Sequence, residues 1–243
     1  MSGAAVAHAG PVPGLEARSL YRFYHAGDDE VLALRGVSLQ VWPGELIAVT
    51  GPSGSGKSTL LACLAGIDDP DGGTVYVSGE RMSRVGERRR GRLRASALGV
   101  LLQSGNLIAH LSVSDNVKLA RRLAGRKLGG DVRRDLEPLG IGHCARAMPE
   151  TLSGGEAARA GLAVALANDP PVLLADEPTG ELDGDTEREV VDLLVDQAVR
   201  GRTVLVVTHS PVLAGAAGRV IDLLDGQVVE GSATPAVRVR GAR

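Results

Sequence analysis

Short apolar segments recur along the chain with the lengths expected of β-strands. The apolar positions 37, 39 and 41 alternate with polar ones, which is typical of a strand with one buried face. Pro43-Gly44 then predicts a turn, and Gly72-Gly73 predicts a second break. Further strands, most of them almost wholly apolar and therefore buried, are predicted at 46–49, 74–77, 172–175 and 203–207.

Helical segments are predicted between these strands. One helix is expected over 57–65 and another over 186–200. Near the end of the chain, residues 219–224, the turn Asp225-Gly226 and residues 227–230 predict a terminal hairpin. Strands that alternate with helices imply an α/β fold whose mostly parallel sheet is covered on both faces.

The pattern changes between about Val85 and Pro149, where helical segments dominate. We interpret this stretch as a helical insertion within the α/β core. It opens with the basic run Arg88-Arg89-Arg90-Gly91-Arg92. Such a run could contact phosphate or nucleic acid, but charges along a helix more often form a solvated face, and we favour that second interpretation.

Composition adds few constraints. Hydrophobic residues make up 44% and charged residues 23%, as in ordinary globular domains, and the aromatic content of 2% means a core of Val, Leu, Ile and Ala. The net charge of -2 gives no reason to expect a nucleic-acid partner. Residues 1–13 are rich in Ala, Gly and Pro and predict a flexible tail, and residues 231–243 predict a flexible basic tail.

The two cysteines give no disulfide or metal pattern on spacing alone. Cys63 falls in a predicted helix, and Cys144 follows His143, a pair with too few ligands for a zinc site. We expect a reduced, cytosolic protein. No apolar run approaches the roughly 20 residues that span a bilayer, and the N-terminus lacks the order of a secretory signal, so a partner chain would have to supply any membrane span.

The clearest chemical motif is a phosphate-binding loop placed between a predicted strand and a predicted helix. Its sequence GPSGSGKS fits the pattern G-x-x-x-x-G-K-[ST]. The glycines let successive backbone N–H groups point at phosphate oxygens, and the helix N-terminus adds partial positive charge. Lys57 would neutralise the β and γ phosphates, and Ser58 would hold Mg²⁺. The expected ATP-binding residues here are Gly51, Pro52, Ser53, Gly54, Ser55, Gly56, Lys57, Ser58 and Thr59.

Two adjacent acids end a later apolar strand. Asp176 follows the run 172–175 and is placed to reach the same Mg²⁺, while Glu177 would face an attacking water. Adjacent acids after a strand could also cap a helix, an interpretation that the upstream phosphate loop makes weak. Gln103 follows the apolar run Val100-Leu101-Leu102, and His209 follows the predicted strand at 203–207. Only their order relative to the other motifs singles them out.

The ordered motifs resemble those of the nucleotide-binding subunits of ATP-binding-cassette (ABC) transporters from about residue 15 to about residue 230. The segment LSGGE, at 152–156, resembles the signature motif of that family, Gln103 its Q-loop, Leu182-Asp183 its D-loop and His209 its switch histidine. Tyr24 takes the place of the aromatic residue that stacks on adenine, although Tyr21 and Phe23 are close enough to compete.

The resemblance implies a fold and a division into parts. The fold is a P-loop NTPase core with a mostly parallel sheet, antiparallel β elements near the N-terminus and an inserted helical subdomain. The ATPase domain would run over 14–230, with the helical subdomain at about 86–155.

The resemblance also implies a shared site, in which two copies sandwich two Mg-ATP head to tail. The γ-phosphate bound by one copy would be contacted in trans by the other copy's Ser153, Gly154 and Gly155, with Asp183 communicating across the dimer. The catalytic residues would be Glu177, His209, Lys57 and Gln103. The Mg²⁺ residues would be Ser58, Gln103 and Asp176.

Segments such as LAGIDDPDGG, QSGNL and TGELD resemble the lipoprotein-releasing and macrolide-exporter branch of the family. That branch implies a homodimer on the cytoplasmic face of the cell membrane, paired with a separate permease of four transmembrane helices and a large extracytoplasmic domain. The alternative is a cassette that transmits force or a signal through such a partner to an extracytoplasmic or cell-wall enzyme. Soluble relatives that act on nucleic acid or ribosomes usually carry two cassettes or a long coiled coil, and this chain has neither.

Some residues depart from the usual family pattern. After LSGGE the family usually runs Gln-Gln-Arg, whereas this chain has Ala157-Ala158-Arg159, and Val164 stands where an arginine is common. Leu102 and Ser210 replace a common phenylalanine and aspartate. The lost polar groups would weaken contacts to the ribose or across the dimer, while no group assigned to hydrolysis is missing.

Overall fold

The computed structural model describes residues 12–26, 29–126 and 131–229, and the two predicted tails lie largely outside these ranges. Its strands form two sheets. A four-stranded antiparallel sheet has the order β2-β1-β4-β5. It comprises β1 (Leu15–Ala26), β2 (Asp29–Val41), β4 (Gly72–Val77) and β5 (Glu80–Arg81).

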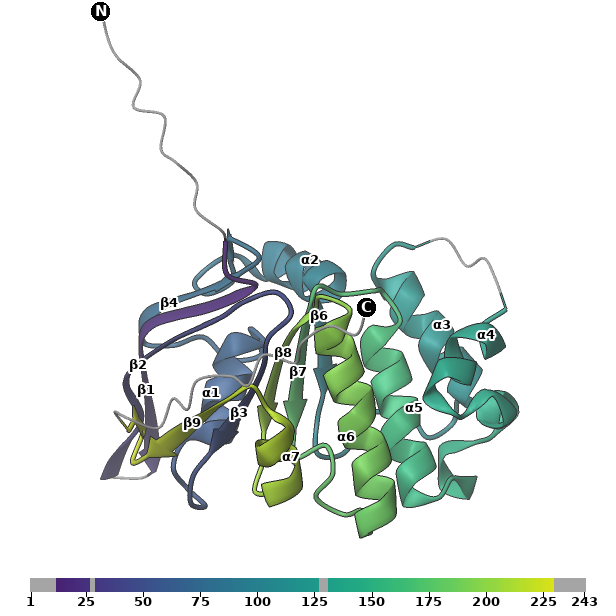
Figure 1. Cartoon of the computed structure of the whole chain (residues 1–243). Helices are drawn as coiled ribbons and strands as arrows, with labels where there is room; N and C mark the ends of the chain where they lie inside the picture. The colour runs from purple at the N-terminus through teal and green to yellow at the C-terminus, as the bar shows by residue number, and fades with distance from the viewer. Residues whose placement is uncertain (1–11, 27–28, 127–130, 230–243) are drawn as a thin grey trace, which may run out of the picture.

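The second sheet has six strands in the order β10-β9-β3-β8-β7-β6, and only β10 is antiparallel to its neighbour. It comprises β3 (Leu46–Thr50), β6 (Leu98–Leu101), β7 (Val172–Asp176), β8 (Thr203–Val207), β9 (Arg219–Leu224) and β10 (Gln227–Val228). The predicted α/β fold, with a mostly parallel sheet and antiparallel strands near the N-terminus, is confirmed (Figure 1).

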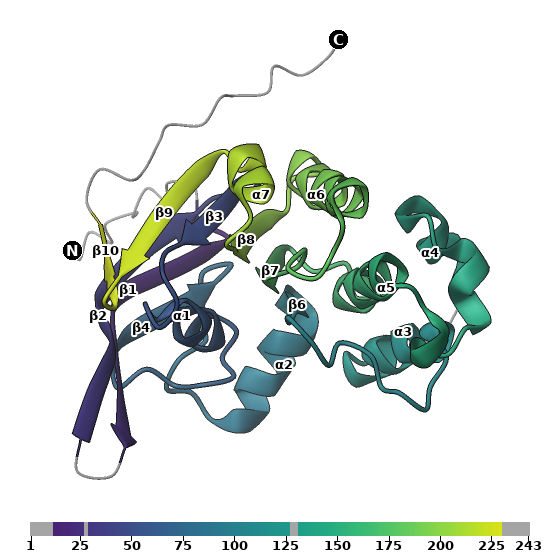
Figure 2. The ribbon, with the colours of Figure 1, turned by 90° about the horizontal axis from the view of Figure 1, so that it is seen from below.

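The central strands are buried on both faces, as their continuous apolar runs predict. Ile47 and Val49 of β3 pack into one core together with α1 (Lys57–Leu64), whereas Leu46 and Ala48 pack into a second core. The second core contains residues of α5 (Gly154–Leu166) and α6 (Gly184–Val199). Figure 2 shows α1 and α6 on opposite sides of the six-stranded sheet.

The remaining helices follow the change in pattern after residue 85. They are α2 (Glu87–Ala97), α3 (Val113–Leu123), α4 (Arg133–Leu136), the 3₁₀ turns η1 (Glu137–Leu139), η2 (Gly142–Arg146) and η3 (Pro149–Thr151), and, after β8, α7 (Pro211–Ala216). The stretch 86–155 is not wholly helical, because β6 within it pairs with β7 in the sheet. Figure 1 shows α3, α4 and α5 together at one side of the molecule. None of the helices in the described ranges combines the length and the apolar character needed to cross a bilayer.

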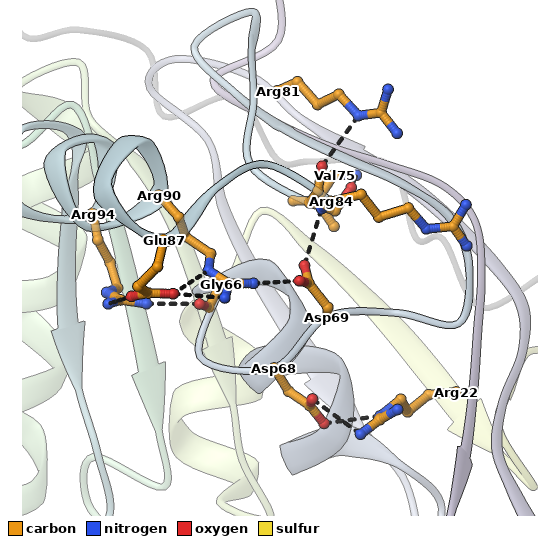
Figure 3. A network of polar contacts seen from close by, with 11 residues as sticks. Arg22, Gly66, Asp68, Asp69, Val75, Arg81, Arg84, Glu87, Arg90 and Arg94 are labelled. Atoms are coloured by element: carbon orange, nitrogen blue, oxygen red, sulfur yellow. Dashed lines mark hydrogen bonds and ion pairs between the residues drawn. The ribbon is translucent and has the colours of Figure 1, made fainter.

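The basic run of α2 divides into two sets. Arg90 pairs with Glu87 and Asp69, and Arg94 pairs with Glu87 and donates to the Gly66 carbonyl oxygen (Figure 3). These contacts fasten α2 to the loop that follows α1. Arg88, Arg89 and Arg92 are exposed, as in the solvated face that we favoured from the sequence.

Candidate functional site

The phosphate loop connects β3 to α1, and its glycines meet different constraints. Gly51 has a φ of 140°, and a Cβ there would lie 2.1 Å from the Leu223 carbonyl oxygen of β9. At Gly56, with a φ of 99°, a Cβ would lie 2.4 Å from the Ala33 carbonyl oxygen. Gly54 has a φ of 78° and open space where a Cβ would be. The first two glycines therefore let neighbouring backbones approach, and the third leaves room for a ligand.

A cavity of about 310 Å³ opens beside this loop. Lys57, Ser58 and Thr59 at the start of α1 line it, together with Gly54 and Gly56. The Lys57 ammonium group donates to the carbonyl oxygens of Gly51 and Pro52, at 2.9 and 2.8 Å. Burial lowers the pKa of Lys57, an effect that the charges of Glu177 and Asp176 oppose. The side chain is thus held over the loop, as a phosphate-binding lysine must be.

The acidic pair lies at the carboxyl end of β7. Burial raises the pKa of the Asp176 carboxyl, and a hydrogen bond from Ser58 partly opposes this rise. Among the described residues, no partner hydrogen-bonds the buried Oδ1 of Asp176 or the buried Oε1 of Glu177. Burying a carboxylate oxygen without a partner is costly unless a cation or a water satisfies it. The unpaired oxygens and the adjacent Ser58 hydroxyl are the hard oxygen ligands that Mg²⁺ prefers, so this set fits a Mg²⁺ ion.

Glu177 and His209 come together from neighbouring strands. The backbone N–H of His209 donates to Glu177 Oε2 at 3.1 Å, and its ring Nε2 lies 3.6 Å from Glu177 Oε1. Glu177 itself has a φ of 44° and donates its N–H to the Val207 carbonyl oxygen at 2.9 Å. The carboxylate and the imidazole therefore face the same point beyond β7 and β8.

Tyr24 lines the cavity of the phosphate loop, at its side nearest β1 and β2. Its hydroxyl donates to Asp68 Oδ2 at 3.1 Å, and the Arg22 guanidinium lies 4.8 Å from the ring centre. Arg22 also pairs with Asp68, as Figure 3 shows, so the two side chains that contact Tyr24 hold each other in place. The competing Tyr21 instead packs against Gly36 and Gly72.

Gln103 lies in a second cavity, of about 330 Å³. Glu177, Gly154 and Leu182 also line it, as do the two alanines that depart from the family pattern, Ala157 and Ala158. The structure therefore brings Gln103 close to Glu177, but in this arrangement it does not place Gln103 in the cavity with Ser58.

The LSGGE segment forms the start of α5. Ser153 caps the helix, accepting from the Glu156 N–H at 3.3 Å, while Glu156 Oε2 accepts from the Ser153 N–H at 2.9 Å. Gly154 and Gly155 form the first turn. Asp183 caps α6 in the same way, accepting from the Thr186 N–H at 3.0 Å.

The four residues expected to act in trans lie outside the phosphate-loop cavity. Its lining, among the described residues, contains neither Ser153, Gly154 and Gly155 nor Asp183. A single chain thus offers one half of the expected contacts in its cavity and the other half elsewhere on its surface.

The sequence did not reveal every residue at the site. Arg35 of β2 and Asp225 of the terminal hairpin also line the phosphate-loop cavity, because the Arg35 N–H bonds the Gly226 carbonyl oxygen at 2.8 Å. No local signal marks them, since only the fold brings 35 and 225 together.

Ser210, a departure from the family pattern, caps α7 and donates to Glu187 of α6.

This chain is similar to known proteins of one family. The family model described as ABC transporter matches residues 34–180. The chain is 41% identical over 220 residues to the lipoprotein-releasing system ATP-binding protein LolD of Pseudomonas fluorescens, covering 88% of this chain and 96% of the relative. It is 39% identical over 225 residues to the macrolide export ATP-binding/permease protein MacB of Hyphomonas neptunium, covering 90% of this chain but 35% of that relative. The chain thus spans about a third of the length of the MacB relative.

Solved structures give the same fold. The dimeric bacterial ABC transporter cassette MJ0796 matches with a TM-score of 0.81 and 34% identity, over 88% of this chain and 96% of that chain. A dimeric post-hydrolysis state of the same cassette, bound to ADP and Pi, matches with a TM-score of 0.82 and 32% identity, over 94% and 100%.

Proposed function

We propose a function from the premise that this chain belongs to the ABC transporter family and is an ATPase. It works as one half of a head-to-tail dimer that drives a separate membrane permease. The observation that carries the proposal is the division of the site. The phosphate loop lines one cavity, while the capped starts of α5 and α6 present Ser153 and Asp183 outside it.

In this proposal the residues around the phosphate loop bind the nucleotide. The backbone N–H groups of residues 51–58 and the N-terminus of α1 hold the phosphates, because their dipoles favour negative charge. The Lys57 ammonium, now bonded to two loop carbonyls, turns to the β and γ phosphates. Tyr24 stacks on the adenine, with its ring orientation fixed by Arg22 and Asp68.

Ser58 and Asp176 would hold a Mg²⁺ ion, and Gln103 would join them from the neighbouring cavity that it shares with Glu177. When bound, Mg²⁺ would neutralise charge that develops on the phosphate oxygens. Glu177 Oε1 is buried and accepts no hydrogen bond from the described residues, so it is free to accept one from the attacking water. His209, held against Glu177 through its backbone N–H, places its imidazole toward the γ-phosphate.

Closure of the dimer would complete each site. Ser153 and the first turn of α5 in one copy would reach the γ-phosphate held by the other, adding a helix N-terminus and a hydroxyl. ATP would then favour the closed dimer by its differential contacts, and hydrolysis would release it.

We assign the chain to the cytoplasmic face of the cell membrane. The similarity to LolD, which covers nearly all of that relative, supports a separate permease partner. The similarity to MacB covers only a part of a chain named as both ATP-binding protein and permease, in keeping with a cassette that works beside a membrane-spanning part. The four-helix permease with an extracytoplasmic domain is the partner that we propose.

The variant Glu177→Gln tests the proposal. It keeps the size of the side chain and one oxygen that can accept from the His209 N–H, but it removes the base, so we expect ATP to bind while turnover falls by about 10²- to 10⁴-fold. Because the bound ATP is not hydrolysed, the protein should accumulate as a dimer. Light scattering with and without Mg-ATP measures the molar mass of the protein. Turnover close to that of the unmodified chain would contradict the role of Glu177, and a monomer with bound ATP would contradict the shared site.

A further inference from the structure

Three chemically different side chains meet beside the start of α5. His143 and Cys144 lie on η2, and Glu156 lies in the first turn of α5. His143 Nε2 lies 3.0 Å from Glu156 Oε1, and Cys144 Sγ lies 3.3 Å from the same oxygen. All three donor atoms lie within 4.8 Å of one another. The sequence offered only the pair 143–144, and the fold adds the third member.

We propose that His143 Nε2, Cys144 Sγ and Glu156 Oε1 form a Zn²⁺ site, with water as the fourth ligand. Imidazole, thiolate and carboxylate are the ligand types that Zn²⁺ takes in proteins. Three such protein ligands leave one position of the tetrahedron for a water. The thiolate favours Zn²⁺ over Mg²⁺ or Ca²⁺, which prefer oxygen alone.

The spacing suits a tetrahedral ion. Zinc bonds of about 2.0 to 2.3 Å place neighbouring ligand atoms roughly 3.3 to 3.8 Å apart. The separations of 3.0 and 3.3 Å from Glu156 Oε1 are already near these values. The third pair, His143 Nε2 and Cys144 Sγ, lies within 4.8 Å, and the imidazole can approach the thiol because its side chain is 67% exposed.

The surrounding structure holds the other two ligands in place. Cys144 is buried in the core that also contains α3 and α5 residues, and its N–H donates to the Ile141 carbonyl oxygen at 2.9 Å. The two carboxylate oxygens of Glu156 have different partners. Oε2 accepts from the N–H and the hydroxyl of Ser153, both at 2.9 Å, while Oε1 faces His143 and Cys144. An ion on Oε1 replaces the thiol proton that Cys144 now donates and leaves the helix cap intact. The helix N-terminus carries a partial positive charge that would repel a cation. The negative charges of the thiolate and the carboxylate together exceed it, so a cation is still attracted.

The zinc site connects to the signature segment through Glu156. Bound Zn²⁺ fixes the carboxylate whose other oxygen holds Ser153, and so restrains the residue proposed to reach the other copy's ATP. This last step rests on the proposed function, whereas metal binding itself does not.

Co²⁺ added to the full-length, nucleotide-free protein tests the site. We expect one ion per chain, with thiolate-to-cobalt charge-transfer absorption and the visible bands of a tetrahedral ion, and displacement by Zn²⁺. Cys144→Ser should abolish the thiolate absorption, and both Cys144→Ser and His143→Gln should weaken Zn²⁺ binding by roughly tenfold or more, in competition with a chelator.

Matched controls separate this site from others. Cys63→Ala removes the only other cysteine, and Asp176→Asn alters the proposed Mg²⁺ site, so both should keep the Co²⁺ spectrum. Because His143 is exposed, His143→Gln should keep the circular dichroism of the parent even if Cys144→Ser unfolds. Absence of thiolate absorption in the parent, or Zn²⁺ affinity unchanged in His143→Gln, would overturn the zinc site.

Hydrogen exchange tests the connection to Ser153 without ATP. In the parent, Zn²⁺ should slow the hydrogen exchange of the amides between 142 and 157. In His143→Gln, Zn²⁺ should leave the exchange rate of the same amides unchanged. Zinc binding without this protection would overturn the restraint on the signature segment while leaving the metal site, and the ATPase proposal, standing.

Discussion

Glu177 adopts a left-handed backbone conformation that costs a residue other than glycine roughly 1 to 3 kcal/mol. Its N–H bond to the Val207 carbonyl oxygen and the bond from the His209 N–H to its carboxylate hold it there. Strain of this kind persists only where the surroundings determine it, and it occurs often at active sites. The buried Oε1 accepts no hydrogen bond from the described residues, which leaves it able to bind a water.

Tyr24 and Tyr21 give a comparison at the scale of single side chains. Tyr24 lines the nucleotide cavity, whereas Tyr21 packs on glycines outside it. Tyr24→Ala should therefore weaken ATP binding by about tenfold, because stacking on a base contributes roughly 1 to 3 kcal/mol. Tyr21→Ala should change it less than about twofold. Calorimetric titration with a non-hydrolysable ATP analogue measures both, and the reverse order would move the adenine site to Tyr21.

Elements were predictable where their burial followed a local pattern. The continuous apolar runs of β3, β7 and β8 predict strands buried on both faces, and the structure has them there. The first strand was not predicted, because β1 carries charged residues and a shifted register around Ser19, whose φ is 48°. The helix α7 (Pro211–Ala216) is too short to show a period.

The contact between β6 and α5 predicts a stability difference between two glycines. A Cβ at Gly99 of β6 would lie 2.5 Å from the Ala165 carbonyl oxygen, whereas a Cβ at Gly91 of α2 would meet no heavy atom within 4 Å. Gly99→Ala should lower the free energy of unfolding by about 1 to 3 kcal/mol, because backbone must move. Gly91→Ala should leave it unchanged or raise it by up to about 1 kcal/mol, because alanine is the better helix former.

Thermal unfolding followed by circular dichroism measures the pair of variants. For a chain of this size 1 kcal/mol corresponds to roughly 2 to 4 °C. Equal midpoints for the two variants would show that α5 and β6 can separate enough to admit a methyl group, contrary to the close packing described.

The site as a whole was predictable in part. The phosphate loop and the acids after β7 could be predicted, because each motif directly adjoins a strand or a helix that can be recognised in the sequence. The approach of Arg35 to the loop, and of Glu156 to His143, depends on pairings between distant segments that no single stretch encodes. The resemblance already implied that the ATP contacts are divided between two copies, and the fold adds that Ser153 and Asp183 lie outside the phosphate-loop cavity.

The central claim is that each ATP is held by the phosphate loop of one copy and the signature segment of another. Lys57→Ala removes the first half of a site, and Ser153→Arg removes the second. Each variant alone has no intact site in a head-to-tail dimer, yet a mixed dimer regains one, formed by Lys57 of the Ser153→Arg copy and Ser153 of the Lys57→Ala copy.

ATP turnover of the two variants, separately and mixed in equal amounts, tests this claim most directly. Random pairing makes half of the dimers mixed, each with one of two sites, so the mixture should regain about a quarter of the turnover of the unmodified chain. Two inactive variants whose mixture shows no more turnover than their sum would contradict the shared site.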